Sequence, residues 1–246
     1  MTNRFLASLP SSARAELEPH LEEAPLNTGA VLHSLGGSID YVYFPHSGLI
    51  STIITMQSGR TAETGMTGRD GLLGSAVVLD VSDAIDQATV EIPGKAARIK
   101  TAQFIRAYRQ CEPLRTIVNW YHAVMIAETQ QSAACNALHN MEERLCRWIL
   151  EAHDRTGLEE PPLTQEFLAN MLGVQRTSVS LVQHKLAAAR LTATRRGMIT
   201  IENMQGLREC SCECYELLKE RAATILPGWR SRNSSWPSTP YSSATG

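Results

Sequence analysis

Residues 165–184 read Gln-Glu-Phe-Leu-Ala-Asn-Met-Leu-Gly-Val-Gln-Arg-Thr-Ser-Val-Ser-Leu-Val-Gln-His, and this stretch decides the fold of the C-terminal part. Two helices that cross steeply need apolar contacts, a small residue at closest approach and a tight turn, often with glycine. Leu168 and Leu172 share one face of a first helix around Ala169, and Gly173 ends it. The second helix has an inward apolar face made of Val179, Val182 and Leu186. The spacing predicts a helix-turn-helix.

The flanks and the outward face of this segment agree with that prediction. Thr164 is a suitable N-cap for the first helix, and Glu166 in its first turn complements the helix dipole. Outward positions carry Arg, Gln, Ser, Thr and Leu, which suit guanine, adenine, phosphates and the thymine methyl group in a major groove. We therefore expect DNA contacts from Gln165, Gln175, Arg176, Thr177, Ser178, Ser180, Leu181, His184 and Lys185.

A β-hairpin wing is predicted directly after the two helices. Residues 191–201 are two β-prone stretches joined through Arg195, Arg196 and Gly197, and both arginines should reach phosphates. Between Leu163 and Thr200 five residues are cationic and only Glu166 is acidic, although the whole chain has a net charge of −2. The plainer alternative, packed helices with a solvated charged face, accounts less well for this local basic balance.

Length and composition set the class of the whole chain. With 246 residues, 43% hydrophobic and 20% charged, it suits one large or two modest globular domains and excludes a wholly disordered, collagen-like or coiled-coil chain. No apolar run approaches the roughly 20 residues that span a bilayer, and no apolar segment with a cleavage site opens the chain. We expect a cytoplasmic protein that avoids membranes and keeps its six cysteines reduced.

The N-terminal half has the pattern of short helices followed by a β-roll. Residues 3–23 predict one or two short helices that break at Pro10. Short β-prone runs separated by glycine then suggest an all-β roll. The expected strands are Val31 to His33, Tyr41 to Phe44, Leu49 to Met56, Thr61 to Thr67, Thr89 to Ile92 and Ala96 to Ile99.

A long helix should connect the two halves. After Cys111 no glycine occurs until Gly157, and apolar residues recur at helical spacing along a seam that becomes polar, a pattern typical of a dimerisation helix. Its expected interface is Leu114, Ile117, Tyr121 and Met125. Further helices are expected from Met141 to His153 and from Met204 to Ile225.

These elements divide the chain into four parts. Residues 1–112 form the sensor-like roll, 113–139 the dimerisation helix, 140–226 the winged helix-turn-helix and 227–246 a disordered tail rich in Ser and Pro.

A glycine-punctuated roll, a long helix and a winged helix-turn-helix together resemble the Crp/Fnr family of bacterial transcription regulators. The most specific stretches are Pro162 to Leu186 and Tyr41-Val-Tyr-Phe-Pro-His-Ser-Gly48. The resemblance implies an α+β fold with a cyclic-nucleotide-binding-like roll. It also implies a homodimer on a palindromic double-stranded DNA operator, a small-molecule effector, and RNA polymerase as a further partner.

The sensor departs from the family pattern. Members that bind cyclic AMP carry a Gly-Glu pair and an Arg, but residues 71–88 contain neither Arg nor Glu and include Asp80, Asp83 and Asp86. We therefore expect the roll not to bind cyclic AMP, because a cyclic phosphate would lack its guanidinium partner. The expected effector pocket, whatever its ligand, is Gly71, Leu72, Leu73, Gly74 and Gln87.

Cofactor and metal sites are not expected. Iron–sulfur ligation as in the oxygen-sensing branch is excluded because no cysteine precedes Cys111, and His33 or His46 is more often a turn or surface residue than a haem ligand. Cys210-Ser-Cys-Glu-Cys214 on one helix would put Cys212 on another face, so these three thiols alone cannot close a tetrahedral site. We expect packing residues there, with a redox or metal role left open.

Two other classes of function are alternatives to a DNA-binding regulator. An enzyme is not expected, because the sequence has no nucleophile elbow, HExxH motif or P-loop. The second alternative hypothesis is a β-roll interaction protein or thiol-redox sensor with weak or nonspecific DNA binding.

Overall fold

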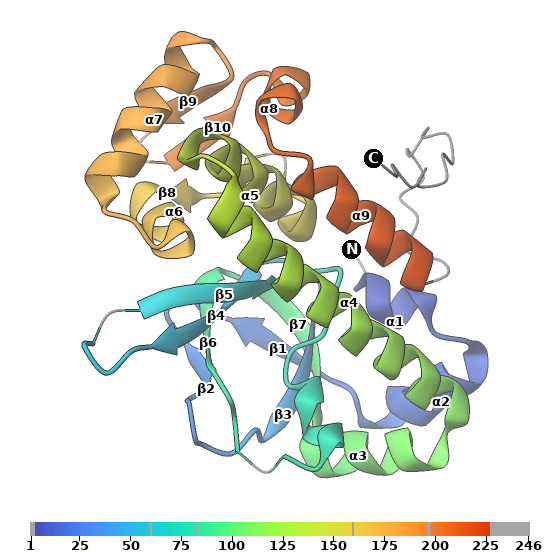
Figure 1. Cartoon of the computed structure of the whole chain (residues 1–246). Coiled ribbons are helices and arrows are strands. Elements are labelled where there is room, and N and C mark those ends of the chain that lie inside the picture. The colour runs from blue at the N-terminus through green and yellow to red at the C-terminus, as the bar shows by residue number, and fades with distance from the viewer. Residues whose placement is uncertain (1–2, 60, 82, 159, 196–197, 227–246) are drawn as a thin grey trace, which may run out of the picture.

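The computed structural model describes residues 3–59, 61–81, 83–158, 160–195 and 198–226. It has the expected α+β architecture, in which a roll of two sheets is followed by a long helix and a C-terminal module of helices with a small sheet (Figure 1). The expected disordered tail lies outside the described residues. None of the described helices is both long and apolar enough to cross a membrane.

Short N-terminal helices cover one end of the roll. They are α1 (Arg4–Ser8), α2 (Ser11–Leu17) and the 3-10 helix η1 (Glu18–His20). Asn3 caps α1, and its side-chain nitrogen Nδ2 donates to the carbonyl oxygens of Pro45 and Gly71, both at 2.8 Å. The break at Pro10 is as expected, and the cap residue ties α1 to the roll.

Two antiparallel sheets form the roll, with strand orders β1-β7-β3 and β2-β6-β4-β5. The strands are β1 (Glu22–Leu26), β2 (Val31–His33), β3 (Tyr41–Pro45), β4 (Leu49–Thr55), β5 (Thr61–Thr67), β6 (Gln87–Ile92) and β7 (Gly94–Lys100). A 3-10 helix, η2 (Ser75–Leu79), lies between β5 and β6. All six predicted strands are present. The sequence did not indicate β1, because Pro25 lies inside it; an edge strand tolerates a proline that donates no hydrogen bond.

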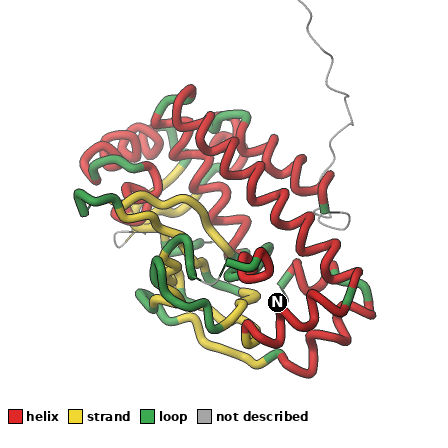
Figure 2. Tube along the Cα trace, turned by 60° about the horizontal axis from the view of Figure 1, so that its bottom comes forward, coloured by secondary structure: helices red, strands yellow, loops and turns green. Residues whose placement is uncertain are grey.

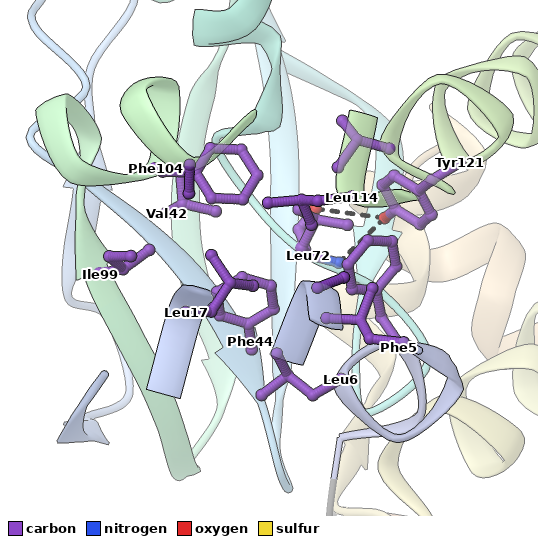
Figure 3. Packing of buried hydrophobic residues seen from close by; sticks show 14 of the residues in the cluster. Phe5, Leu6, Leu17, Val42, Phe44, Leu72, Ile99, Phe104, Leu114 and Tyr121 are labelled. Carbon is purple, nitrogen blue, oxygen red and sulfur yellow. Dashed lines mark hydrogen bonds between the residues drawn. The ribbon is translucent and has the colours of Figure 1, made fainter. Parts of the chain in front are cut away.

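Two helices follow the roll, α3 (Thr101–Gln110) and the 27-residue α4 (Glu112–Leu138). The inner face of α4 packs into the aromatic core between the roll and the N-terminal helices (Figure 3). The ring of Tyr121 meets that of Phe5 edge-on, with centroids 5.5 Å apart. The long helix is confirmed, and its inner face is buried against the rest of its own chain.

The C-terminal module consists of α5 (Met141–Thr156), β8 (Leu163–Thr164), α6 (Gln165–Leu172), α7 (Arg176–Ala188), β9 (Thr192–Arg195), β10 (Met198–Ile201), α8 (Met204–Cys210) and α9 (Cys214–Ile225). The prediction of one continuous helix from Met204 to Ile225 is wrong. Ser211 has extended backbone and its hydroxyl donates to the carbonyl of Arg208 at 2.8 Å, which ends α8. The break directs α9 back along α4 (Figure 1).

The module is packed onto the roll of the same chain. Leu49, Met66 and Ile92 of the strands share one apolar cluster with Trp148 and Phe167. Figure 2 shows the strands gathered on one side of the molecule, with the long helices running across them.

A backbone contact closes the junction between roll and module. The amide of Arg69 donates to the carbonyl of Arg155 at 2.9 Å. A Cβ at the neighbouring Gly68 would lie 2.4 Å from that carbonyl oxygen, so the close approach requires glycine.

Candidate nucleic-acid interface

The turn between α6 and α7 has the geometry that its sequence predicts. The hydroxyl of Thr164 accepts a hydrogen bond from the amide of Phe167 at 3.1 Å and so caps α6. Gly173 ends α6 in the left-handed region at φ 65°, and the amide of Val174 donates to the carbonyl of Ala169 at 3.0 Å. The N-cap and the glycine turn are both confirmed.

Apolar contacts fix the angle between the two helices. Leu168, Val179 and Leu186 are fully buried, and Val182 packs at the edge of the same cluster. This cluster continues into α5 through Leu145 and others, so the pair of helices rests on a third. The inward faces are those expected from the spacing.

Most of the predicted DNA contacts lie on the outer surface of the module. Leu181 is 74% exposed on the outer side of α7. Ser178, Ser180 and Gln165 are half-buried. The other exposed members of the set are Gln175, Arg176, Thr177, His184, Lys185 and Arg195.

A chain of glutamines joins the two helices to the wing. The side-chain oxygen of Gln165 accepts from the hydroxyl of Ser180 at 2.8 Å, and its nitrogen donates to the Gln183 oxygen at 2.8 Å. Gln183 donates in turn to the hydroxyl of Thr194 on β9 at 2.9 Å. Sequence reasoning missed Gln183, although its position four residues after Val179 places it on the inward helical face.

The wing is a hairpin of β9 and β10, which β8 extends to three strands. Arg195 is exposed at the end of β9, while Arg196 lies outside the described residues. Lys185 forms an ion pair with Glu142 of α5. Among the described residues, the module also exposes Arg176 at the start of α7 and Arg195 on the wing.

The predicted dimer interface needs a correction. Leu114 and Tyr121 are buried within their own chain, and the Tyr121 hydroxyl donates to the carbonyl of Leu72 at 3.2 Å while its oxygen lies 3.2 Å from the Leu72 amide (Figure 3). Neither side chain can meet a second copy. Of the other two predicted residues, Ile117 is half-buried and Met125 is 39% exposed.

The outer face of α4 carries apolar residues that the prediction did not include. Trp120 is 40% exposed and Ile126 is 59% exposed, and Ala123 lies between them. The helical spacing of apolar residues indicated an apolar seam on this helix, but the roll and the N-terminal helices cover part of that seam.

A cavity of about 330 Å³ lies between β4, β5, α4 and α5. Its lining includes Thr52, Met125, Glu128, Glu151 and Arg155. The structure does not bring the predicted effector residues to it: Leu72 and Leu73 are buried in the core, and Gly71, Gly74 and Gln87 are also absent from the lining.

Charges in this cavity are already matched by each other. Arg155 donates to a carboxylate oxygen of Glu128 at 3.0 Å and lies 3.9 Å from Asp70. Burial raises the pKa of Glu128, and the Arg155 charge works against that shift. Glu151, also in the lining, accepts from Arg147 at 2.8 Å. The arrangement presents carboxylates to the cavity and offers little to an anion.

Comparison with known proteins places the module in a family. Residues 143–210 match the Crp-like helix-turn-helix domain. No curated protein sequence matches the chain.

Solved structures share the fold over most of the chain. FixK2 from Bradyrhizobium japonicum is similar with a TM-score of 0.68 and 14% identity, over 78% of this chain and 98% of that one. The c-di-GMP-responsive global regulator CLP from Xanthomonas campestris is similar with a TM-score of 0.64 and 14% identity, over 78% of this chain and 99% of that one. A CRP/FNR-family transcriptional regulator from Thermus thermophilus is similar with a TM-score of 0.63 and 18% identity, over 79% of this chain and 98% of that one. The chain therefore shares its fold with Crp/Fnr-family regulators, and its residues 143–210 match the Crp-like helix-turn-helix domain.

Proposed function

We propose that the protein is a sequence-specific DNA-binding transcription regulator that acts as a homodimer. The observation that carries the proposal is the exposed polar face of α7, which lies next to the hairpin that bears Arg195. A recognition helix reads base edges with its N-terminal residues, and Arg176 and Thr177 are the first two residues of α7. Arg176 is the candidate for a bidentate guanine contact.

The homodimer is supported by the outer face of α4. Trp120 and Ile126 are apolar and exposed, and the same helix carries further exposed alanines. A second copy of α4 would cover this face in an isologous contact, together with Met125. Two-fold symmetry then places two recognition helices on a palindromic site.

The roll is proposed to work without cyclic AMP. A cyclic phosphate entering the cavity would meet Glu128 and Glu151, and Arg155 is already engaged by Glu128 and Asp70. A phosphate that paired with Arg155 would compete with these buried carboxylates, and breaking a buried ion pair is costly. Any signal for this regulator should therefore be a different, less acidic molecule or none.

DNA binding is tested by fluorescence anisotropy with duplex DNA over a range of salt concentrations. We expect an affinity that falls as salt rises, and an Arg176→Ala variant that loses about 1 to 3 kcal/mol on the preferred sequence. Arg106→Ala is the matched control, since Arg106 is an exposed arginine on α3. Equal behaviour of the two variants would overturn the proposal.

A further inference from the structure

Four side chains with metal-binding atoms meet where α4 ends and α9 begins. Cys135 and His139 are one turn apart at the C-terminal end of α4. Cys212 and Cys214 come from the break between α8 and α9. The three sulfur atoms and a ring nitrogen of His139 all lie within 4.8 Å of one another.

The separations match a tetrahedral site. The sulfurs of Cys135 and Cys212 are 3.6 Å apart, and the Cys214 sulfur is 3.5 Å from Nδ1 of His139. Zinc bonds of about 2.3 Å to sulfur and about 2.0 Å to nitrogen, at tetrahedral angles, put such ligand atoms about 3.5 to 3.8 Å apart. A disulfide would need two sulfurs at about 2.05 Å.

The surroundings also suit a metal. The three cysteines are buried, so the set of four protein ligands would be closed to water. Nε2 of His139 lies 3.0 Å from a carboxylate oxygen of Glu213, which leaves Nδ1 facing the thiols. A histidine ligand whose other nitrogen is held by a carboxylate is the usual outer shell of zinc sites. Gln131 donates to the Cys214 sulfur at 3.1 Å.

We propose that Cys135, His139, Cys212 and Cys214 bind one Zn²⁺ in a closed tetrahedral site. Each cysteine binds as a thiolate, so any thiol still protonated releases its proton to solvent, and the metal keeps its oxidation state. Three thiolates and Zn²⁺ leave one negative charge, and the buried guanidinium of Arg147, which also pairs with Glu151, interacts favourably with it.

The site has a structural consequence. It joins the end of α4, the helix proposed to dimerise, to the first residue of α9, the last helix of the C-terminal module. It also accounts for the interrupted helix, because Cys212 reaches the other ligands only from the break between α8 and α9. Cys210, in the same Cys-Ser-Cys-Glu-Cys stretch, lies apart and contacts Glu142 instead.

The test is zinc content and affinity of the full chain, purified under reducing conditions. We expect one zinc per chain by elemental analysis, and thermal unfolding at a lower temperature after chelation that is restored by adding Zn²⁺ alone. Replacing zinc with Co²⁺ should give the visible spectrum of a tetrahedral thiolate site. Zinc absent from the protein and not taken up on titration, or stoichiometric iron in its place, would overturn the proposal.

Variants separate ligation from packing. Cys212→Ser should lose zinc, and Cys210→Ser, two residues away, should retain it with wild-type affinity. Glu213→Gln should keep the stoichiometry but bind zinc about 10- to 100-fold more weakly. Equal loss in the two cysteine variants, or a Cys135–Cys212 disulfide by mass spectrometry in the protein prepared with reductant, would contradict the assignment.

Discussion

Gln183 holds the recognition helix to both of its neighbours, so its removal tests how the module is built. The side chain is 2% exposed and makes two hydrogen bonds, to Gln165 of α6 and to Thr194 of the wing. Each is worth about 0.5 to 1.5 kcal/mol net. In a variant without Gln183, water can form some of the lost hydrogen bonds, because Thr194 is exposed and Gln165 is half-buried.

Truncation also leaves a small cavity in a buried position. We therefore expect Gln183→Ala to lower the free energy of unfolding by about 2 kcal/mol, and Gln183→Leu, which keeps most of the volume, by about 1 kcal/mol. Urea denaturation should show a lower midpoint with an unchanged slope. DNA affinity should fall as well, because the wing and α6 lose their common anchor on α7.

Gln205→Ala is the matched control, because Gln205 is exposed on α8 and bonds Glu209 one turn away at 2.9 Å. Such a surface change should stay within about 0.5 kcal/mol. If Gln183→Ala falls in that same range, the buried glutamine contributes no net stability and the reasoning fails.

The remaining predictions concern charge, assembly and ligand. Burial raises the pKa of Glu63 above its ordinary 4.5 in the folded state, so the free energy of unfolding of the wild-type protein should fall as pH rises above that value. Glu63→Gln should therefore make the urea midpoint depend less on pH, and a midpoint-against-pH curve parallel to that of the wild type would refute this. Arg195→Ala should reduce the salt slope of DNA binding by about one unit and leave sequence preference unchanged, whereas a changed preference would make it a base contact. Ile126→Glu should give monomers in sedimentation while Val31→Glu, at an exposed apolar residue on β2 of the roll, stays dimeric; a dimeric Ile126→Glu protein would move the interface elsewhere. Calorimetry with cyclic AMP should show no tight binding, and a low-micromolar dissociation constant would contradict the cavity argument.

Local patterns predicted the parts of the fold that local physics determines. The helix-turn-helix followed from residue spacing, since Leu168 and Val179 must face one another and Gly173 must turn the chain. The strand β1 was missed because Pro25 disfavours a strand unless it is at an edge, and an edge is a property of the whole sheet.

Features that depend on distant contacts could not be predicted. Periodicity marked Leu114 and Tyr121 as apolar positions, but the sequence does not say that the chain's own roll covers them. The candidate effector residues were placed by alignment with the family, whereas the cavity depends on how α5 packs on the roll. The four-ligand cluster required two segments more than 70 residues apart to meet, as the Cys135–Cys212 contact shows.

The central claim is that α7 reads DNA sequence as part of a two-fold dimer. Its most direct test is selection of bound duplexes from a random-sequence library by the full-length protein. We expect enrichment of one palindromic sequence. When Arg176 is replaced by Ala, the base preference should be relaxed at one position in each half-site. Retention of duplexes without any enriched sequence, or no retention at low salt, would contradict it.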